Sequence, residues 1–168
     1  MKKYIIVLAI IISILALNKH EKIIIPQEAI RFRIIANSNT REDQKLKREI
    51  IDNLSNTINE TQQNKTIEEA RFYIKNNLPK WEDITKKTLL ENNKDNTIQV
   101  KYGMNYFPEK IYKNVIYPEG EYESLVITIG EGEGDNFWCV LFPPLCFTEE
   151  QEDLEYHSFI KEIINKYF

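Results

Sequence analysis

The most unusual local composition in the chain is an acidic, glycine-rich stretch, which reads Gly130-Glu-Gly-Glu-Gly-Asp-Asn136. A nucleotide-binding loop is excluded because the order is G-x-G-x-G, no lysine follows, and the three carboxylates would repel a phosphate. A solvated hairpin connection is the ordinary interpretation. A calcium site and a partner-binding loop are the alternatives, since carboxylate and carbonyl oxygens suit a hard cation, although the spacing is not that of an EF-hand.

A second polar stretch, Asn37-Ser-Asn-Thr40, is followed by Asp43 and Gln44. Such side chains occur in acid/base and serine catalysis, but the sequence offers no evident partner for that chemistry. Asn, Ser and Thr also form the turns and helix caps at strand-to-helix junctions. We therefore favour a structural role for this stretch over catalysis.

The N-terminus is typical of an export signal. Two lysines precede a 14-residue apolar run that ends at Leu17, shorter than the roughly 20 residues that cross a bilayer. No Ala-x-Ala cleavage signal follows, so residues 1–25 are either a signal peptide or an uncleaved anchor, with a buried core helix as the alternative. Basic residues before the run predict that 26–168 crosses the membrane as one exported domain.

Charge and composition argue against nucleic-acid binding, binding of anionic membranes and a Cys/His zinc site. The chain has 22 basic and 26 acidic residues, a net charge of −4, and without residues 1–25 the balance is 18 to 25, or −7. That is too acidic for a general binder of nucleic acid or anionic membranes, which acts by counterion release. With few cysteines and histidines, a Cys/His zinc site is not expected either. We predict no metal and no cofactor.

Cys139 and Cys146 flank a short apolar segment that contains Pro143-Pro144. An exported protein reaches an oxidising compartment, so a disulfide between them is considered first, and two buried free thiols are the alternative. A cysteine nucleophile is poorly supported, because His157 is the only histidine beyond the leader and lies on a helix of structural character.

Four helices follow from apolar periodicity and capping residues. Leu46, Ile50, Leu54 and Ile58 recur every four residues behind a cap at Thr40. Capping boxes begin at Thr66 and Thr148, and Pro79 is typical of a first helical position. The predicted helices cover about 41–62, 66–78, 79–89 and the segment from 148 to the C-terminus.

Strands are indicated where the apolar period changes to two or becomes continuous, over about 30–36, 97–102, 124–129 and 137–142. The order of strand, three helices, three strands and helix predicts an α+β fold. We expect a single two-layer domain, with a small mixed or antiparallel sheet of about four strands packed with about four helices, preceded by the N-terminal signal or anchor helix.

Three blocks of this sequence resemble the stage II sporulation protein R family. They are RFRIIANSNTREDQ over 31–44, PEGEYESL over 118–125 and IGEGEGDNFWCVLFPPLCF over 129–147. They occur in the family's order. The departures are mild, with Asn39 where Asp is usual and Phe137 where Trp is common.

The resemblance implies an intercellular signal of sporulation. Such a protein is made in the forespore, is exported into the space between the forespore and mother-cell membranes, and activates the membrane-embedded aspartic protease that processes the precursor of sigma-E. It implies no enzymatic activity. Membrane contact would occur through the N-terminal segment if that segment is uncleaved.

We expect the partner to bind the two polar stretches, together with one aromatic residue for which core packing is the ordinary interpretation. The predicted contact residues are Asn37, Ser38, Asp43, Gln44, Gly130, Gly132, Gly134, Asp135, Asn136 and Trp138. The competing class is an exported hydrolase of cell wall or peptide that uses Asp135 or Cys139. A calcium-dependent structural module is the third alternative.

Overall fold

The fold is that of a computed structural model, which describes residues 23–112, 115–146 and 153–168, with side chains in the last range from 160 onward. Residues 1–22 of the predicted leader (1–25) and the predicted cap at Thr148 lie outside these residues. Within them, no helix is both long and apolar enough to cross a membrane.

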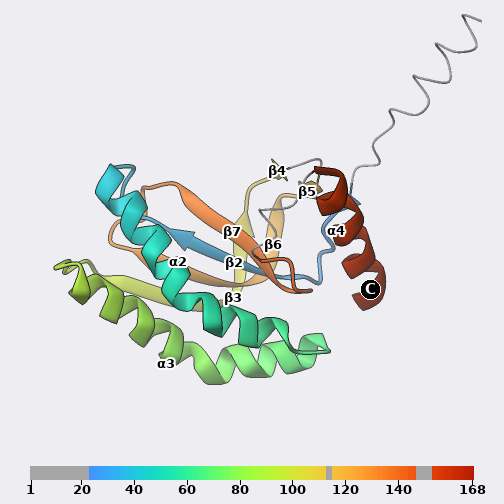
Figure 1. The fold of residues 1–168 in the computed structure, drawn as a ribbon, viewed down its shortest axis with the longest axis horizontal. Helices are drawn as coiled ribbons and strands as arrows, with labels where there is room; N and C mark the ends of the chain where they lie inside the picture. Colours follow the sequence, from blue (N-terminus) through green and yellow to red (C-terminus); the bar gives the residue numbers. More distant parts are fainter. Residues whose placement is uncertain (1–22, 113–114, 147–152) are drawn as a thin grey trace, which may run out of the picture.

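Two helices cover one face of a four-stranded mixed sheet, which confirms the predicted α+β architecture (Figure 1). The strand order is β3-β6-β2-β7, with β2 parallel to β6 and the other two pairs antiparallel. The strands are β2 (Ile30–Ile35), β3 (Ile98–Phe107), β6 (Gly120–Ile129) and β7 (Asn136–Phe142), and the helices are α2 (Arg41–Gln62) and α3 (Ile67–Glu91).

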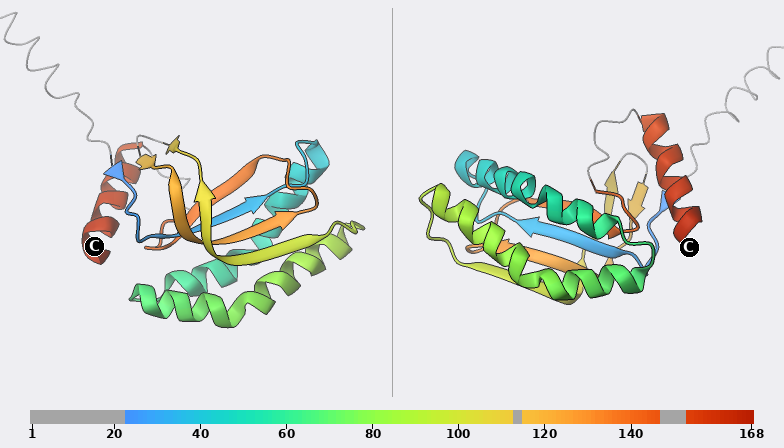
Figure 2. Two further views of the ribbon diagram at one scale, coloured as in Figure 1. Left: turned by 180° about the vertical axis from the view of Figure 1, so that it is seen from behind. Right: turned by 60° about the horizontal axis from the view of Figure 1, so that its bottom comes forward.

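Alternation along β2 divides its side chains between two environments. Phe32 and Ile34 are fully buried in the core between the sheet and the helices, where the Phe32 ring lies 5.3 Å from that of Trp81. Arg31 and Arg33 lie on the opposite face. Seen from behind, none of the helices in the described part of the chain crosses in front of the four-stranded sheet (Figure 2, left).

Helix α2 matches its prediction, with the Thr40 hydroxyl accepting the Asp43 N–H at the cap. The prediction of a separate helix starting at Pro79 is wrong, because α3 runs through this residue and bends near its middle (Figure 1). Ala70, Ile74 and Trp81 form one buried face at helical spacing. Proline removes a single internal hydrogen bond, and burial of this continuous face keeps the helix intact across that loss.

A second, three-stranded sheet was not predicted. It pairs β1 (Ile23–Ile24), β5 (Val115–Tyr117) and β4 (Lys110–Tyr112) in the order β1-β5-β4. Helix α4 (Asp153–Tyr167) contributes Ile160 to the small core beneath it. Strands of two or three residues are too short to show a period of two. Three helices are therefore described where about four were expected, since two predicted helices form α3.

Candidate functional site

The two polar stretches that the sequence singles out meet at one end of the four-stranded sheet. Strands β2 and β6 are parallel neighbours, so both carboxyl ends lie at the same edge. The chain leaves β2 through 36–40 into α2 and leaves β6 through 130–135 into β7. We call residues 36–44, which include the first turn of α2, the junction, and residues 130–136, which include the first residue of β7, the acidic loop. Their proximity follows from the topology.

Backbone N–H groups of the acidic loop are bound by oxygens of the junction. Asn37 accepts through its side chain from Glu131 N at 3.1 Å and through its carbonyl from Glu133 N at 3.1 Å. Asn39 Oδ1 accepts from Asp135 N at 2.7 Å. The loop is therefore docked through its backbone, while its acidic side chains are exposed to solvent.

The buried side chain of Asp43 fixes the conformation of the junction by hydrogen bonds. Its carboxylate, only 6% exposed, accepts hydrogen bonds from Ser38 Oγ at 2.6 Å and Asn37 Nδ2 at 2.8 Å. These two bonds lower the pKa of Asp43 despite its burial. Asp43 is thus a buried, ionised anchor that orients Asn37 toward the acidic loop.

Gln44 and Lys47 add a second link between the segments. Gln44 Nε2 donates to the Ser38 carbonyl at 2.9 Å. Lys47 is 7% exposed, and its Nζ donates to Gln44 Oε1 and to the Asp135 carbonyl, both at 2.7 Å. Burial lowers the pKa of Lys47. Lys47 was not predicted as a site residue, although its position one turn after Asp43, on the apolar face of the helix, was a usable signal.

Steric constraints explain why three positions of the acidic loop are glycine. Gly130 has a φ of +55°, and a Cβ there would collide with Asn37 Oδ1. At Gly134 a Cβ would collide with the Ser38 carbonyl. Gly132 also has a positive φ, of +68°. These residues let the loop approach the junction closely, so they shape the surface without offering side chains to a partner.

The structure thus brings nine of the ten predicted contact residues together. Glu131, Glu133, Asp135 and Asn136 form the exposed rim of the loop. In the part of the chain described, no group of three or more His, Cys, Asp or Glu side chains is placed to hold a metal ion. What the site presents is an ordered, acidic surface.

Trp138 is the exception among the predicted residues. It lies on β7, half-buried on the sheet face away from the helices, with its ring 5.1 Å from that of Phe107. Cys139 and Cys146 are joined in a disulfide that belongs to the main core. The sulfur of Cys139 is therefore no nucleophile in this state.

Comparisons with known proteins agree on one family. The family model described as stage II sporulation protein R matches residues 26–152. A curated relative, stage II sporulation protein R of Bacillus subtilis (strain 168), is 44% identical over 147 residues, which cover 82% of this chain. The match spans 66% of the relative's length, just under two thirds. No solved structure matches the chain. The chain belongs to the stage II sporulation protein R family.

Proposed function

We propose that this protein is an exported signal of sporulation that activates the membrane-embedded aspartic protease of the sigma-E pathway. It acts from the space between the forespore and mother-cell membranes. Membership of the stage II sporulation protein R family supports a role in sporulation. The export signal read from residues 1–25 and the acidic composition of the remaining chain support action outside the cytoplasm.

The observation that carries the proposal is the interlocked surface of the junction and the acidic loop. Backbone N–H groups of the acidic loop donate to side-chain and carbonyl oxygens of the junction, and Glu131, Glu133 and Asp135 stay on the rim. A preformed loop loses little conformational entropy on binding. Such a surface suits recognition of a protein with a complementary basic face.

Activation by binding requires that the surface prefers one state of the partner. A ligand shifts a conformational or dimerisation equilibrium only by its differential affinity for the two states. We propose that the acidic loop binds the extracytoplasmic side of the protease more tightly in its active form. In this scheme the protein itself performs no bond-breaking step.

Charge reversal on the rim tests the proposal. The double variant Glu131→Lys/Glu133→Lys should abolish processing of the sigma-E precursor when added to membranes that contain the protease and its precursor. Both side chains are exposed, so the circular dichroism spectrum and thermal midpoint should stay close to those of the parent.

The matched control is Asp52→Lys/Asp83→Lys, which changes the net charge equally at exposed positions on α2 and α3. This control should retain processing. Normal processing by the Glu131/Glu133 variant would refute the assigned surface. Turnover of septal peptidoglycan by the purified protein, lost in Asp135→Asn, would instead favour an enzyme.

A further inference from the structure

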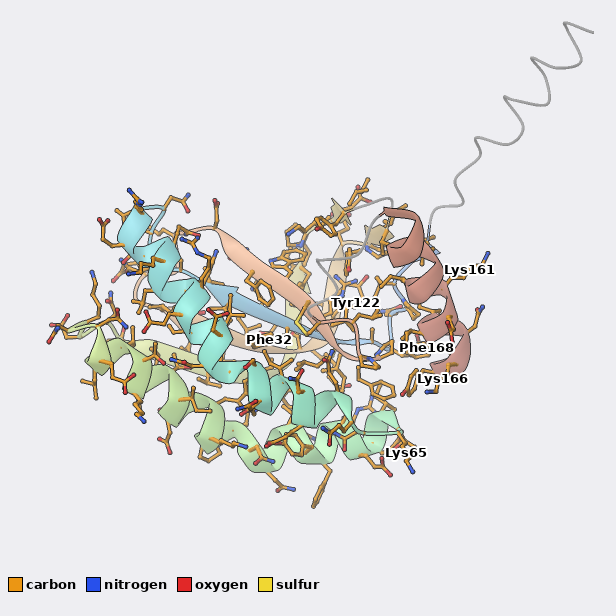
Figure 3. The ribbon with its side chains drawn as sticks, in the orientation of Figure 1. Phe32, Lys65, Tyr122, Lys161, Lys166 and Phe168 are labelled. Atoms are coloured by element: carbon orange, nitrogen blue, oxygen red, sulfur yellow. A yellow bond between two sulfur atoms is a disulfide. The ribbon has the colours of Figure 1, made fainter. Side chains whose placement is uncertain are left out.

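The sheet face turned away from α2 and α3 carries a cluster of cations and aromatic rings. We call it the arginine box and define it as Arg31, Arg33, Phe107, Tyr122 and Trp138. The guanidinium carbon of Arg31 lies 3.3 Å from the centroid of the Tyr122 ring, which Figure 3 labels. The guanidinium carbons of Arg31 and Arg33 lie 5.4 and 4.8 Å from the centroid of one ring, Phe107. Both cations therefore contact the same aromatic ring.

Arg31 is only 1% exposed, yet its hydrogen bonds are incomplete. Nη1 donates to the Pro118 carbonyl at 3.3 Å. Nε and Nη2 are buried and have no hydrogen-bond partner, and the same is true of Arg33 Nε. Nε and Nη2 form the edge of a guanidinium whose two parallel N–H groups match the two oxygens of a carboxylate.

The chain contains a filled example of this geometry. Arg71 Nε donates to the Glu123 carboxylate at 2.9 and 3.0 Å, and Arg71 Nη2 lies 2.8 Å from Glu123 Oε2. Across the described residues the ion pairs involve Arg71 and three lysines but neither arginine of the box. The edge that binds a carboxylate on Arg71 has no hydrogen-bond partner on Arg31.

Two desolvated cations without a counterion are unfavourable. Burial lowers the pKa of both Arg31 and Arg33, and interactions with Tyr122 and Tyr117 offset only part of this effect at Arg31. A planar anion would supply both the missing acceptor and the missing charge. We propose that the arginine box binds a carboxylate.

The half-buried Arg33 and Trp138 mark the open side of the box, where exposed Lys110 has its Nζ 5.1 Å from the centroid of the Trp138 ring. A carboxylate would first meet Lys110 and Arg33. It would reach Arg31 only after a shift of the side chains that now seal it. The group could be an Asp or Glu side chain of a partner protein or a small free carboxylic acid, because both present the same two oxygens.

The inference does not depend on the proposed function and is tested on the full chain. Trp81→Phe leaves Trp138 as the only tryptophan, and its fluorescence and the thermal midpoint are followed during titration at constant ionic strength. The probes are acetate, a blocked Gly-Glu-Gly peptide, its Gly-Gln-Gly counterpart and inorganic phosphate, each against chloride. Acetate and the Glu peptide should give saturable changes, and the Gln peptide none.

Arg33→Gln in the same background should weaken acetate binding by about tenfold or more, because a charged hydrogen bond is lost. Arg33 is used because Arg31 is fully buried, so that its replacement would also disturb the fold. Arg48→Gln, at an exposed position of α2, should leave binding unchanged. A Glu peptide that binds more tightly than acetate would identify a partner side chain as the source, and equal or tighter binding of acetate a free acid.

Three results would overturn the assignment. The first is the absence of any saturable effect of acetate and of the Glu peptide. The second is an equal effect in Arg33→Gln. The third is binding of phosphate alone, which would replace a planar carboxylate by a tetrahedral ligand.

Discussion

The carboxylate of Asp43 shows how a residue type that suggests catalysis can be structural. It is almost inaccessible to solvent, and both of its described side-chain donors, Ser38 Oγ and Asn37 Nδ2, come from the junction. By fixing the Asn37 amide it directs Asn37 Oδ1 toward Glu131 N. The Asn-Ser-Asn stretch is therefore understood as the anchor of the acidic loop.

Replacing Asp43 by Asn should lower the free energy of unfolding at neutral pH by about 1–3 kcal/mol, because two buried donors lose a charged acceptor. The folded-state pKa of Asp43 lies below its reference of 3.8. Its stabilisation is therefore complete above that reference and is lost as the pH falls through the folded-state pKa.

Denaturant unfolding of both proteins, followed by tryptophan fluorescence, tests this expectation. The difference in unfolding free energy between them should shrink below about pH 4. A difference that stays constant from neutral to acidic pH would show that the ionised carboxylate is not the stabilising group.

Gly134→Ala should destabilise the protein by about 1–3 kcal/mol, since an added methyl group would collide with the Ser38 carbonyl. Asn136→Ala, at an exposed position two residues later, should stay within about 0.5 kcal/mol of the parent. Thermal unfolding compares the two. Equal stability would contradict the close approach of loop and junction, and the expected loss makes Gly→Ala changes unsuitable probes of partner binding.

At the scale of elements, α3 carries a proline in its interior. Pro79→Ala restores an internal N–H donor, so we expect the free energy of unfolding to rise by about 1–3 kcal/mol. Asn76→Ala, at an exposed position of the same helix, should gain no more than about 0.7 kcal/mol from helix propensity. Urea unfolding measures both. A loss of stability in Pro79→Ala would mean that packing of Trp81 requires the bend.

The disulfide links β7 to the turn that follows it. It closes a short loop, with a sequence separation of 7 between the cysteines. Chain entropy predicts that Cys139→Ala/Cys146→Ala loses about 2–3 kcal/mol of unfolding free energy. The reduced parent protein should lose a similar amount in the same urea titration. Unchanged stability in both would show that the bond contributes nothing to the fold.

At the scale of the whole molecule, one small core joins α4 and the small sheet to Val140 of β7 in the larger sheet. Ile160 is fully buried against Ile23 and its neighbours, although it lies beyond the residues that the family model matches. Ile160→Ala should therefore cost about 2–5 kcal/mol. Asn165→Ala, exposed on the same helix, is the control in denaturant unfolding. A negligible effect at Ile160 would make α4 dispensable.

Much of the fold was predictable because local signals agreed with the packing. Thr40 and the fourfold period after it predicted α2, and alternation or a continuous apolar run predicted the four strands of the larger sheet, although β3 and β6 are longer than predicted. The predicted break between two helices at Pro79 was wrong, because burial of one continuous helix face outweighs a missing hydrogen bond. Strands β4 and β5 are too short for any periodicity to be visible.

The residues of the site were predictable from the sequence, but their contacts with one another were not. Asn37 and Glu131 are 94 positions apart, and no local pattern places them together. Their contact depends on the parallel pairing of β2 with β6. The unpaired guanidinium edge of Arg31 could not be predicted either, because an alternating basic strand ordinarily indicates a solvated face.

Strand β1 limits how far the folded domain can lie from an uncleaved leader. Ile23–Ile24 pair with β5 and Ile25 is buried, so a cleavage after residue 25 would remove part of the fold. A leader that stays attached would connect to β1 through only five residues, 18–22, a tether of at most about 20 Å. The domain would then stay at the surface of the membrane that holds the leader. Under the function proposed above, the width of the gap between the two membranes, rather than diffusion, would decide whether the domain reaches the protease.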